Sequence, residues 1–106
     1  LDILPDSIKK LASLKKLYIG GNNIFYFSGM RYLTELTHLD VSDNKFDDLK
    51  GIEDLKSLEY VAIDGNEFYS SRDDVTFTTM SEHVIRHLKD LEQRGCRVDG
   101  RVPPLR

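Results

Sequence analysis

The stretch LTHLDVSDNKF, residues 36–46, holds a single asparagine among regularly spaced apolar residues. Apolar and polar side chains alternate through Leu39, Asp40 and Val41, which indicates a short strand with one buried face. Asn44 follows that strand and precedes the apolar Phe46, so an amide side chain is placed beside an apolar core. A buried amide needs hydrogen-bond partners, and the turn around Asn44 should supply them.

The same pattern occurs in two further stretches. LKKLYIGGNNI (14–24), LTHLDVSDNKF (36–46) and LEYVAIDGNEF (58–68) align without a gap, and each starts 22 residues after the last. All of them fit apolar-x-x-apolar-x-apolar-x-x-Asn-x-apolar. A constant period over these units, with apolar positions that also recur between them, predicts a solenoid of stacked repeats.

Stacking gives the asparagines a structural role. Each unit is too small to bury its own apolar face, so the units should pair their strands into a parallel sheet and share one core. The turn after each strand leaves inward-facing backbone N–H and C=O groups without sheet partners, and an amide side chain can both donate and accept hydrogen bonds. We therefore expect a structural asparagine ladder of Asn22, Asn44 and Asn66.

These motifs resemble the leucine-rich repeat family, whose LxxLxLxxNxL pattern is matched at the three units. The resemblance covers residues 1 to about 70. The 22-residue period is similar to the shorter class of the family, and the opening LDILPDSIKKLASL to its intracellular bacterial and plant type. The resemblance implies an α/β solenoid: a short right-handed arc with a parallel sheet on its concave face and helical or 3₁₀ returns on its convex face. It says little about the ligand, because the shared motif is the core.

A different pattern follows the repeats. Thr79 and Glu82 have the spacing of a capping box, with Thr79 as N-cap and Glu82 at N3. An apolar stripe at helical spacing predicts one buried helix face, formed by Met80, Val84, Leu88 and Leu91 with Ile85 beside it. Gly95 is suited to end this helix as the C′ residue, and Cys96 and Val98 then alternate with Arg97 as in a short strand. The run HLKDLEQRGCRVDG resembles the terminal helix and strand after the last repeat in several leucine-rich repeat proteins, so we expect a C-terminal cap with Cys96 as a small buried hydrophobe.

The expected organisation is a single domain of 106 residues. Repeats fill residues 1–70, with a partial first repeat and full repeats that start near residues 14, 36 and 58. The cap covers residues 71–99, and a tail takes residues 100–106. The strand of the partial repeat is missing, so the strand around Tyr18 should have an unpaired outer edge. Either further repeats precede Leu1 in a larger multidomain protein, which we favour, or the chain self-associates through this N-terminal edge.

Composition narrows the classes of partner. Charged residues make up 31% of the chain and the formal net charge is -3, which does not favour a nucleic acid or a membrane surface. No apolar run approaches the roughly 20 residues of a membrane-spanning helix. Cys96 is the only cysteine, which excludes an internal disulfide of the kind found in secreted caps. We expect a cytoplasmic protein.

The sequence offers little catalytic chemistry. His83 and His87 are four residues apart on the expected helix, with Asp90 on the same flank, and such a spacing could hold a divalent metal. The glutamate of EHVIRH precedes the first histidine, so this is not the HExxH motif of a metalloprotease, and we interpret the pair as a polar helix flank. GxSxG and a phosphate-binding glycine loop are absent. We expect no enzyme activity, no catalytic residue, no metal site and no cofactor.

The variable strand positions carry the functional hypothesis. They should point out from the sheet onto the concave surface, where aromatic and charged residues gather: Lys16, Tyr18, His38, Asp40, Asp43, Tyr60 and Asp64. Tyrosines are frequent interface anchors, and carboxylates around them favour a partner with exposed basic residues. We therefore expect a protein–protein interaction module. The alternative is a structural domain that acts as a spacer or as an assembly unit.

Overall fold

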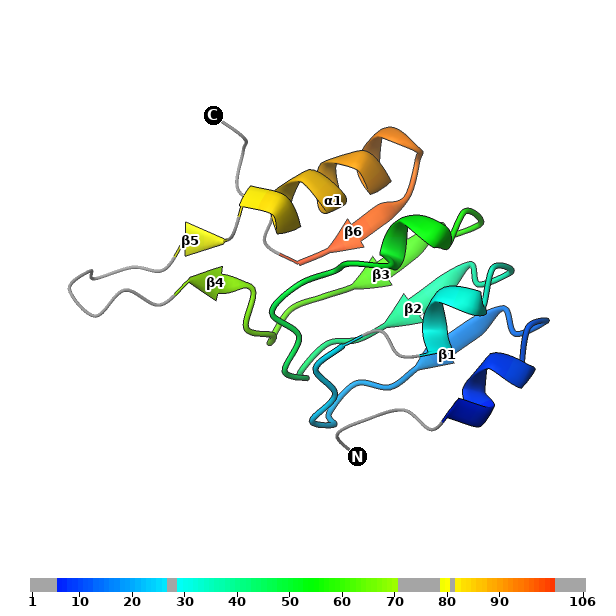
Figure 1. Cartoon of the computed structure of the whole chain (residues 1–106). Helices are drawn as coiled ribbons and strands as arrows, with labels where there is room; N and C mark the ends of the chain where they lie inside the picture. The colour runs from blue at the N-terminus through cyan, green and yellow to red at the C-terminus, as the bar shows by residue number, and fades with distance from the viewer. Residues whose placement is uncertain (1–5, 27–28, 71–78, 81, 101–106) are drawn as a thin grey trace.

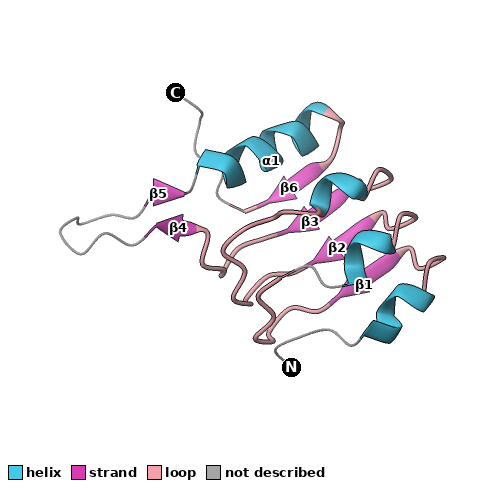
Figure 2. Ribbon diagram, in the orientation of Figure 1, coloured by secondary structure: helices cyan, strands magenta, loops and turns pink. Residues whose placement is uncertain are grey.

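The computed structural model describes residues 6–26, 29–70, 79–80 and 82–100 of the chain. Short 3₁₀ helices alternate with strands in the first part: η1 (Asp6–Lys10), β1 (Lys16–Tyr18), η2 (Gly29–Tyr32), β2 (His38–Asp40), η3 (Ile52–Asp54) and β3 (Tyr60–Ala62). A short strand pair, an α-helix and a last strand follow: β4 (Tyr69–Ser70), β5 (Thr79–Met80), α1 (Glu82–Gln93) and β6 (Arg97–Asp99). Figures 1 and 2 show the strands β1, β2, β3 and β6 side by side, with η1, η2, η3 and α1 packed along them.

The four strands form one parallel sheet in the order β1-β2-β3-β6. The register pairs Leu17 with Leu39 and Leu39 with Val61, which are 22 residues apart, and then Val61 with Val98. The predicted α/β solenoid with parallel strands, 3₁₀ returns and a C-terminal helix is therefore confirmed. β2 covers His38–Asp40, one residue earlier than the alternation through Leu39, Asp40 and Val41 indicated, whereas β6 covers Arg97–Asp99, one residue later than the alternation from Cys96 to Val98 indicated.

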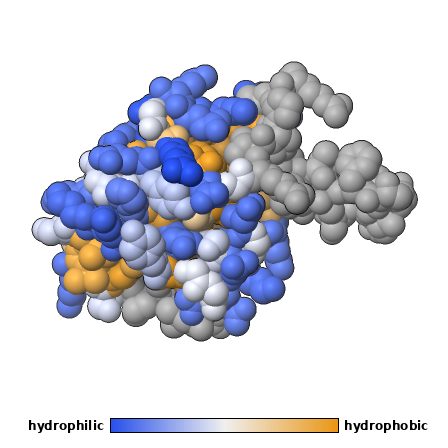
Figure 3. All heavy atoms as spheres, turned by 180° about the vertical axis from the view of Figure 1, so that it is seen from behind, coloured by the Kyte–Doolittle hydropathy of each residue, from blue (hydrophilic) through white to orange (hydrophobic). Residues whose placement is uncertain are grey.

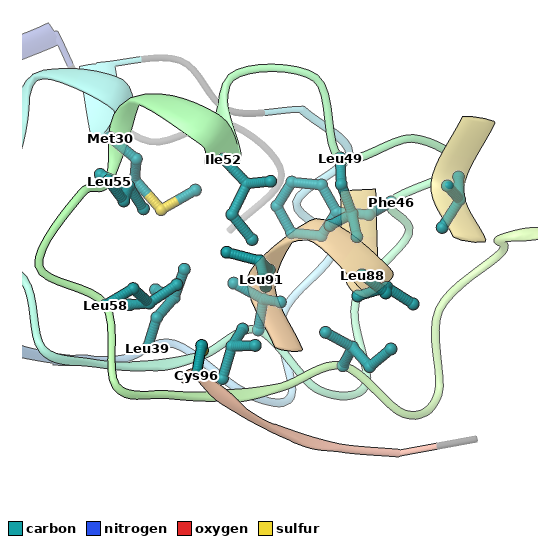
Figure 4. Packing of buried hydrophobic residues seen from close by; sticks show 14 of the residues in the cluster. Met30, Leu39, Phe46, Leu49, Ile52, Leu55, Leu58, Leu88, Leu91 and Cys96 are labelled. Atoms are coloured by element: carbon teal, nitrogen blue, oxygen red, sulfur yellow. The ribbon is translucent and has the colours of Figure 1, made fainter. Parts of the chain in front are cut away.

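The side chains between the sheet and the returns form a single hydrophobic cluster. Leu36 and Leu39, two leucines of the repeat motif, are 0% exposed. Leu88 and Leu91 of α1 are also 0% exposed and belong to the same cluster. Figure 4 shows these helix side chains beside those of the repeats, including Phe46. The helix thus covers the end of the stack, which otherwise would leave an apolar face in water.

The start of α1 differs from the sequence-based expectation. Thr79 and Met80 form β5, which pairs antiparallel with β4, and α1 begins at Glu82. The capping-box prediction is therefore wrong: Thr79 is not the N-cap, Glu82 opens the helix instead of occupying N3, and Met80 is not part of the helical stripe. Pairing with Tyr69–Ser70 holds the backbone of residues 79–80 in an extended conformation. The strand that makes this contact lies outside the four residues, N-cap to N3, by which a capping box is recognised.

The end of α1 follows the expectation. Gly95 has a φ of 91°, its N–H donates to the carbonyl of Glu92, and the N–H of Cys96 donates to the carbonyl of Leu91. These two bonds define a Schellman motif and confirm Gly95 as the C′ residue.

Cys96 is 4% exposed, and burial raises the pKa of its thiol to about 11. Within the described part of the chain, no helix is both long and apolar enough to cross a membrane.

Equivalent turns of the repeats share a left-handed residue and stack closely. Gly21 and Gly65 have φ values of 79° and 76°, and Asp43, between them in the stack, has a φ of 54°. A Cβ atom on Gly65 would lie 3.0 Å from the backbone N and Cα of Asp43, whereas a Cβ atom on Gly21 would have no neighbour within 4 Å. The two glycines therefore share a left-handed backbone but differ in packing: the turn of the preceding repeat lies against Gly65, whereas a Cβ atom on Gly21 would meet no described atom.

We expect Gly65→Ala to lower the free energy of unfolding more than Gly21→Ala does. Left-handed strain in a non-glycine residue costs about 1 kcal/mol or more in both variants. Gly65→Ala adds a close contact with the backbone of the preceding turn, which should bring its cost to roughly 2–3 kcal/mol. Denaturant unfolding of the two variants measures the difference. Equal losses would contradict the close stacking of these turns.

Candidate functional site

The outward-facing strand positions form two rows on the sheet face that points away from the core, which we term the open face. The register places the first residue of each strand in one row, the aromatic–basic row: Lys16, His38, Tyr60 and Arg97. The third residues form the carboxylate row: Tyr18, Asp40, Ala62 and Asp99. The rows are about 6.6 Å apart, because a strand rises about 3.3 Å per residue. The open face therefore carries opposite charge along its two sides.

Tyr60 lies inside the aromatic–basic row and has contacts on three sides. Its hydroxyl donates a hydrogen bond to Oδ2 of Asp99 at 2.8 Å. Its ring centroid lies 5.9 Å from that of His38, and Cζ of Arg97 lies 5.9 Å from the same ring. The hydrogen bond to Asp99 is the main cause that raises the pKa of Tyr60, with burial and nearby carboxylates adding to it and Arg97 opposing it. The ring is thus held in one place while part of it remains exposed.

His38 has a defined orientation beside Tyr60. Its Nδ1 lies 2.9 Å from Oγ1 of Thr37, and the same Oγ1 lies 3.1 Å from the carbonyl oxygen of Lys15. Oγ1 of Thr37 thus lies within hydrogen-bond distance of both Nδ1 of His38 and the carbonyl of Lys15, and the tautomer of the imidazole decides which atom of the His38–Thr37 contact donates.

Asp40 and Tyr18 lie side by side in the carboxylate row. Oδ1 of Asp40 accepts hydrogen bonds from the backbone N–H of Ser42 at 2.9 Å and from its hydroxyl at 2.6 Å. The negative charge is therefore fixed at the end of β2. Tyr18 exposes 61% of its surface. A fixed carboxylate beside an exposed aromatic ring is suited to receive a cationic group that also packs on the ring.

The structure places the predicted binding residues in two settings. Five lie on the strands of the open face: Lys16, Tyr18, His38, Asp40 and Tyr60. Asp43 and Asp64 lie in the turns after β2 and β3, and both are exposed. Arg97 and Asp99 also lie in these rows but were not predicted, because they belong to β6, which follows the third repeat and lies outside the 22-residue period. The polar–apolar alternation of Arg97, Val98 and Asp99 indicates a further strand of the same sheet. On such a strand, Arg97 and Asp99 would have been expected to face outward.

Asn44 joins two neighbouring turns and is 2% exposed. Its Nδ2 donates to the carbonyls of Ile19, at 3.0 Å, and of Val41 and Ser42, at 3.1 and 3.0 Å. Its Oδ1 accepts from the N–H of Ile24 at 3.1 Å. The amide therefore bonds both to its own unit and to the preceding one.

The other asparagines occupy the same place in their turns. Asn66 repeats the pattern one unit later, donating to Val41 and Ile63 and accepting from the N–H of Phe46. Asn22 donates to the carbonyl of Ile19 at 2.8 Å. Consecutive asparagines thus share an acceptor, and the shared carbonyls belong to Ile19 and Val41. All of these bonds are internal to the fold, so they place the asparagines in the framework and not on the open face.

His83 and His87 of α1 face two separate carboxylates in the segment between β2 and β3. Nε2 of His83 lies 3.4 Å from Oδ1 of Asp48, and Nδ1 of His87 lies 3.5 Å from Oε2 of Glu53. Among the residues that the structure describes, no group of three or more His, Cys, Asp or Glu side chains is arranged to hold a metal ion. These histidines therefore serve as contacts between the cap and the repeats.

Similarity to known proteins agrees with the stacked sheet and the asparagine spacing. The family model described as Leucine Rich Repeat matches residues 35–58, which contain β2 and Asn44. A solved leucine-rich repeat protein of Leptospira interrogans is similar over 93% of this chain, with a TM-score of 0.71 and 25% sequence identity. The chain spans 22% of the length of that protein. Together with the strand register, these matches show a leucine-rich repeat fold and support the leucine-rich repeat family for this chain.

Proposed function

We propose that the chain is a non-enzymatic module that binds a protein partner on the open face of its sheet, as one part of a larger multidomain protein. Leucine-rich repeat domains are commonly protein-interaction modules, and both the family match and the fold support this class of function. The proposal places the contact on the outward strand positions, because the other side of the sheet is occupied by the hydrophobic core.

The arrangement around Tyr60 is the observation that carries the proposal. Asp99, His38 and Arg97 hold the ring in position before any partner arrives. An immobilised side chain loses little further rotamer freedom on binding, and that loss otherwise costs about 0.5–1.5 kcal/mol per side chain. A partly exposed tyrosine that is already ordered is therefore well suited as an interface anchor.

The charges of the two rows indicate the chemistry of the partner. Basic side chains complement Asp40 and Asp99 of the carboxylate row, with Asp43 and Asp64 in the adjoining turns. Electrostatic complementarity of this kind mainly raises the association rate and selects against wrong partners. We therefore propose a protein segment that presents basic residues toward the C-terminal ends of the strands.

Tyr60→Ala should weaken binding of the partner at least thirtyfold, because removal of an interface anchor typically costs about 2 kcal/mol or more. Asp40→Asn should weaken binding less and flatten its dependence on salt, since asparagine keeps an Oδ1 acceptor for Ser42 but loses the charge. The measurement is a Kd titration with a purified partner, first captured on the immobilised chain, at two salt concentrations.

Two further variants make this test decisive. Tyr60 also bonds to β6, so the melting temperature of each variant is measured in parallel, and Tyr18→Ala provides a second anchor variant at a side chain that is 61% exposed. Lys56→Ala lies on the return side, is exposed, and should leave the Kd unchanged. If Lys56→Ala weakens binding while Tyr18→Ala and Tyr60→Ala do not, the partner does not bind the open face.

A further inference from the structure

Ala62 has the shortest side chain of the open face and lies among four longer ones. The register places Asp40 beside it on β2 and Asp99 beside it on β6. Along its own chain, Tyr60 precedes Ala62 by two residues and the exposed Asp64 follows it by two. Ala62 is 9% exposed and does not belong to the hydrophobic cluster, so the longer side chains around it rise above its methyl group.

The carboxylates on both sides of Ala62 are each held through one oxygen. Oδ1 of Asp40 accepts from the N–H and the hydroxyl of Ser42, and Oδ2 of Asp99 accepts from the hydroxyl of Tyr60. Among the described residues, no donor bonds to Oδ2 of Asp40 or to Oδ1 of Asp99, and neither carboxylate joins an ion pair. Each carboxylate thus keeps one fixed acceptor for a group from outside the described chain.

The ring of Tyr60 adds an aromatic surface beside Ala62. Tyr60 stands in the aromatic–basic row, and its hydroxyl reaches Asp99 in the carboxylate row at 2.8 Å. The ring therefore runs diagonally past Ala62 and is fixed at its far end. An exposed aromatic ring beside carboxylates is suited to a cation that packs on the ring while it bonds to the charges.

The spacing of the two carboxylates suits a wide cation. Adjacent strands lie about 4.8 Å apart, so the Cα atoms of Asp40 and Asp99, on the two strands that flank β3, are about 9.6 Å apart. Among the described residues, no group of three or more His, Cys, Asp or Glu side chains is arranged to hold a metal ion. A guanidinium carries several N–H donors in one plane and can donate to carboxylates on two sides at once, whereas an ammonium is a compact point charge.

Charge complementarity favours a basic occupant over an apolar one. Figure 3 shows the molecule from behind, where hydrophilic side chains cover most of the described surface and hydrophobic surface gathers at the lower left. Around Ala62 the charges are mainly negative, from Asp40, Asp64 and Asp99, and Arg97 is the opposing charge next to Tyr60. An apolar side chain would remove water from Asp40 and Asp99 without bonding to them, whereas a cation bonds to both.

We propose that the open face receives an arginine side chain of the protein partner over Ala62. The guanidinium donates to Oδ2 of Asp40 on one side and to Oδ1 of Asp99 on the other, and it packs on the ring of Tyr60. This inference rests on the proposed function and names the partner residue that the face selects. Charge-assisted bonds to two fixed carboxylates favour arginine over lysine. Ala62 determines the specificity, because a longer side chain there would fill the space of the guanidinium.

Short peptides test the choice of cation without the natural partner. The probes are the acetylated peptide amide Gly-Ala-Arg-Ala-Gly and the same peptide with lysine or citrulline in place of arginine, titrated at low salt into the isotope-labelled full chain and followed by NMR. The arginine peptide should shift the backbone amide signals of Asp40, Ala62 and Asp99 saturably, and the Kd of the lysine peptide should be about threefold higher or more. Citrulline keeps the shape of arginine without its charge and should give no saturable shift. Equal Kd values for arginine and lysine, or no saturable shift with arginine, would overturn the proposal.

Four variants locate the contact. Asp40→Asn and Asp99→Asn keep an amide oxygen for the internal hydrogen bonds but lose the charge, and each should raise the Kd of the arginine peptide about threefold or more. Ala62→Leu keeps every charge and should raise the Kd about fivefold or more, because it occupies the space of the guanidinium. Asp47→Asn is the matched control, exposed and outside the open face, and should leave the Kd unchanged. Melting temperatures are measured in parallel, and the two asparagine variants at the site decide the test if Ala62→Leu does not fold.

The captured partner separates this inference from the proposed function. If Tyr18→Ala and Tyr60→Ala weaken binding of the partner but a folded Ala62→Leu does not, the open face remains the docking surface and the arginine site is overturned. If Lys56→Ala alone weakens binding of the partner, the proposed function fails, and this inference fails with it. Loss of partner binding in Ala62→Leu, together with a lower Kd for the arginine peptide than for the lysine peptide, is the result that we expect.

Discussion

Asn44→Leu should lower the free energy of unfolding by about 3 kcal/mol or more, although it replaces a polar side chain inside an apolar core. The largest single loss is at the N–H of Ile24, whose bond to Oδ1 of Asn44 is 3.1 Å long. Ile24 is 0% exposed, so water does not replace the missing acceptor. A buried donor without a partner costs about 1–3 kcal/mol.

The carbonyls that accept hydrogen bonds from Asn44 lose less stabilisation than the N–H of Ile24 does, because each carbonyl also accepts a bond from a second donor. Ile19 also accepts from Asn22, Val41 from Asn66, and Ser42 from the N–H of Gly21. The two amide protons of Asn44 are shared among these three carbonyls, so about two bonds are lost, each contributing about 0.5–1.5 kcal/mol. These losses add to that at Ile24 and bring the expected total to about 3 kcal/mol or more.

Lys45→Leu is the matched control for Asn44→Leu. The side chain of Lys45 is exposed, and its ion pair with Glu67 spans 3.7 Å at the surface, where such pairs contribute about 0–1 kcal/mol. Thermal and denaturant unfolding of both variants gives the comparison. The melting temperature should fall by more than about 10 °C for Asn44→Leu and by a few degrees at most for Lys45→Leu. Equal melting temperatures would show that the asparagine ladder does not hold the turns together.

The repeat register was predictable because it depends on spacing alone. A period of 22 residues places Leu17, Leu39 and Val61 in one column, and the strand register pairs these residues. Gly95 was predictable for a similar reason, since a helix end with a left-handed residue is encoded within a few positions. Features that repeat, or that are complete within one turn, can be read from a single sequence.

Contacts between segments that share no period were not predictable. The helix start depends on β4, which pairs with residues 79–80, and no motif around Thr79 reports that pairing. The setting of Tyr60 depends on Asp99, which is 39 residues away and belongs to a strand outside the repeat period. The outward-facing positions of the repeat strands could be predicted from the sequence. The hydrogen bonds between side chains of different strands could be found only in the structure.

Deletion of residues 79–99 should abolish the cooperative unfolding transition. The deleted segment includes α1, whose Val84, Ile85, Leu88 and Leu91 are buried against the repeats. Complete burial of one such side chain contributes about 1.5–3 kcal/mol, so the four together are comparable with the total stability of about 5–15 kcal/mol of a typical domain. The deletion also uncovers β3 on the side that β6 occupies. The remaining chain would then be uncovered at both ends of the described stack, and we expect it to aggregate or to unfold without a sharp transition.

Two point variants separate the covering role of α1 from a general effect of truncation. Leu88→Ala removes a side chain that is 0% exposed and should lower the free energy of unfolding by about 2–5 kcal/mol. Gln93→Ala lies on the exposed side of the same helix and should change it by less than about 0.5 kcal/mol. Calorimetry of the full chain, of the deletion and of both point variants measures these effects. If the deleted chain stays soluble with a sharp transition, and Leu88→Ala melts with the wild type, α1 is an appendage and the three repeats are stable without a cap.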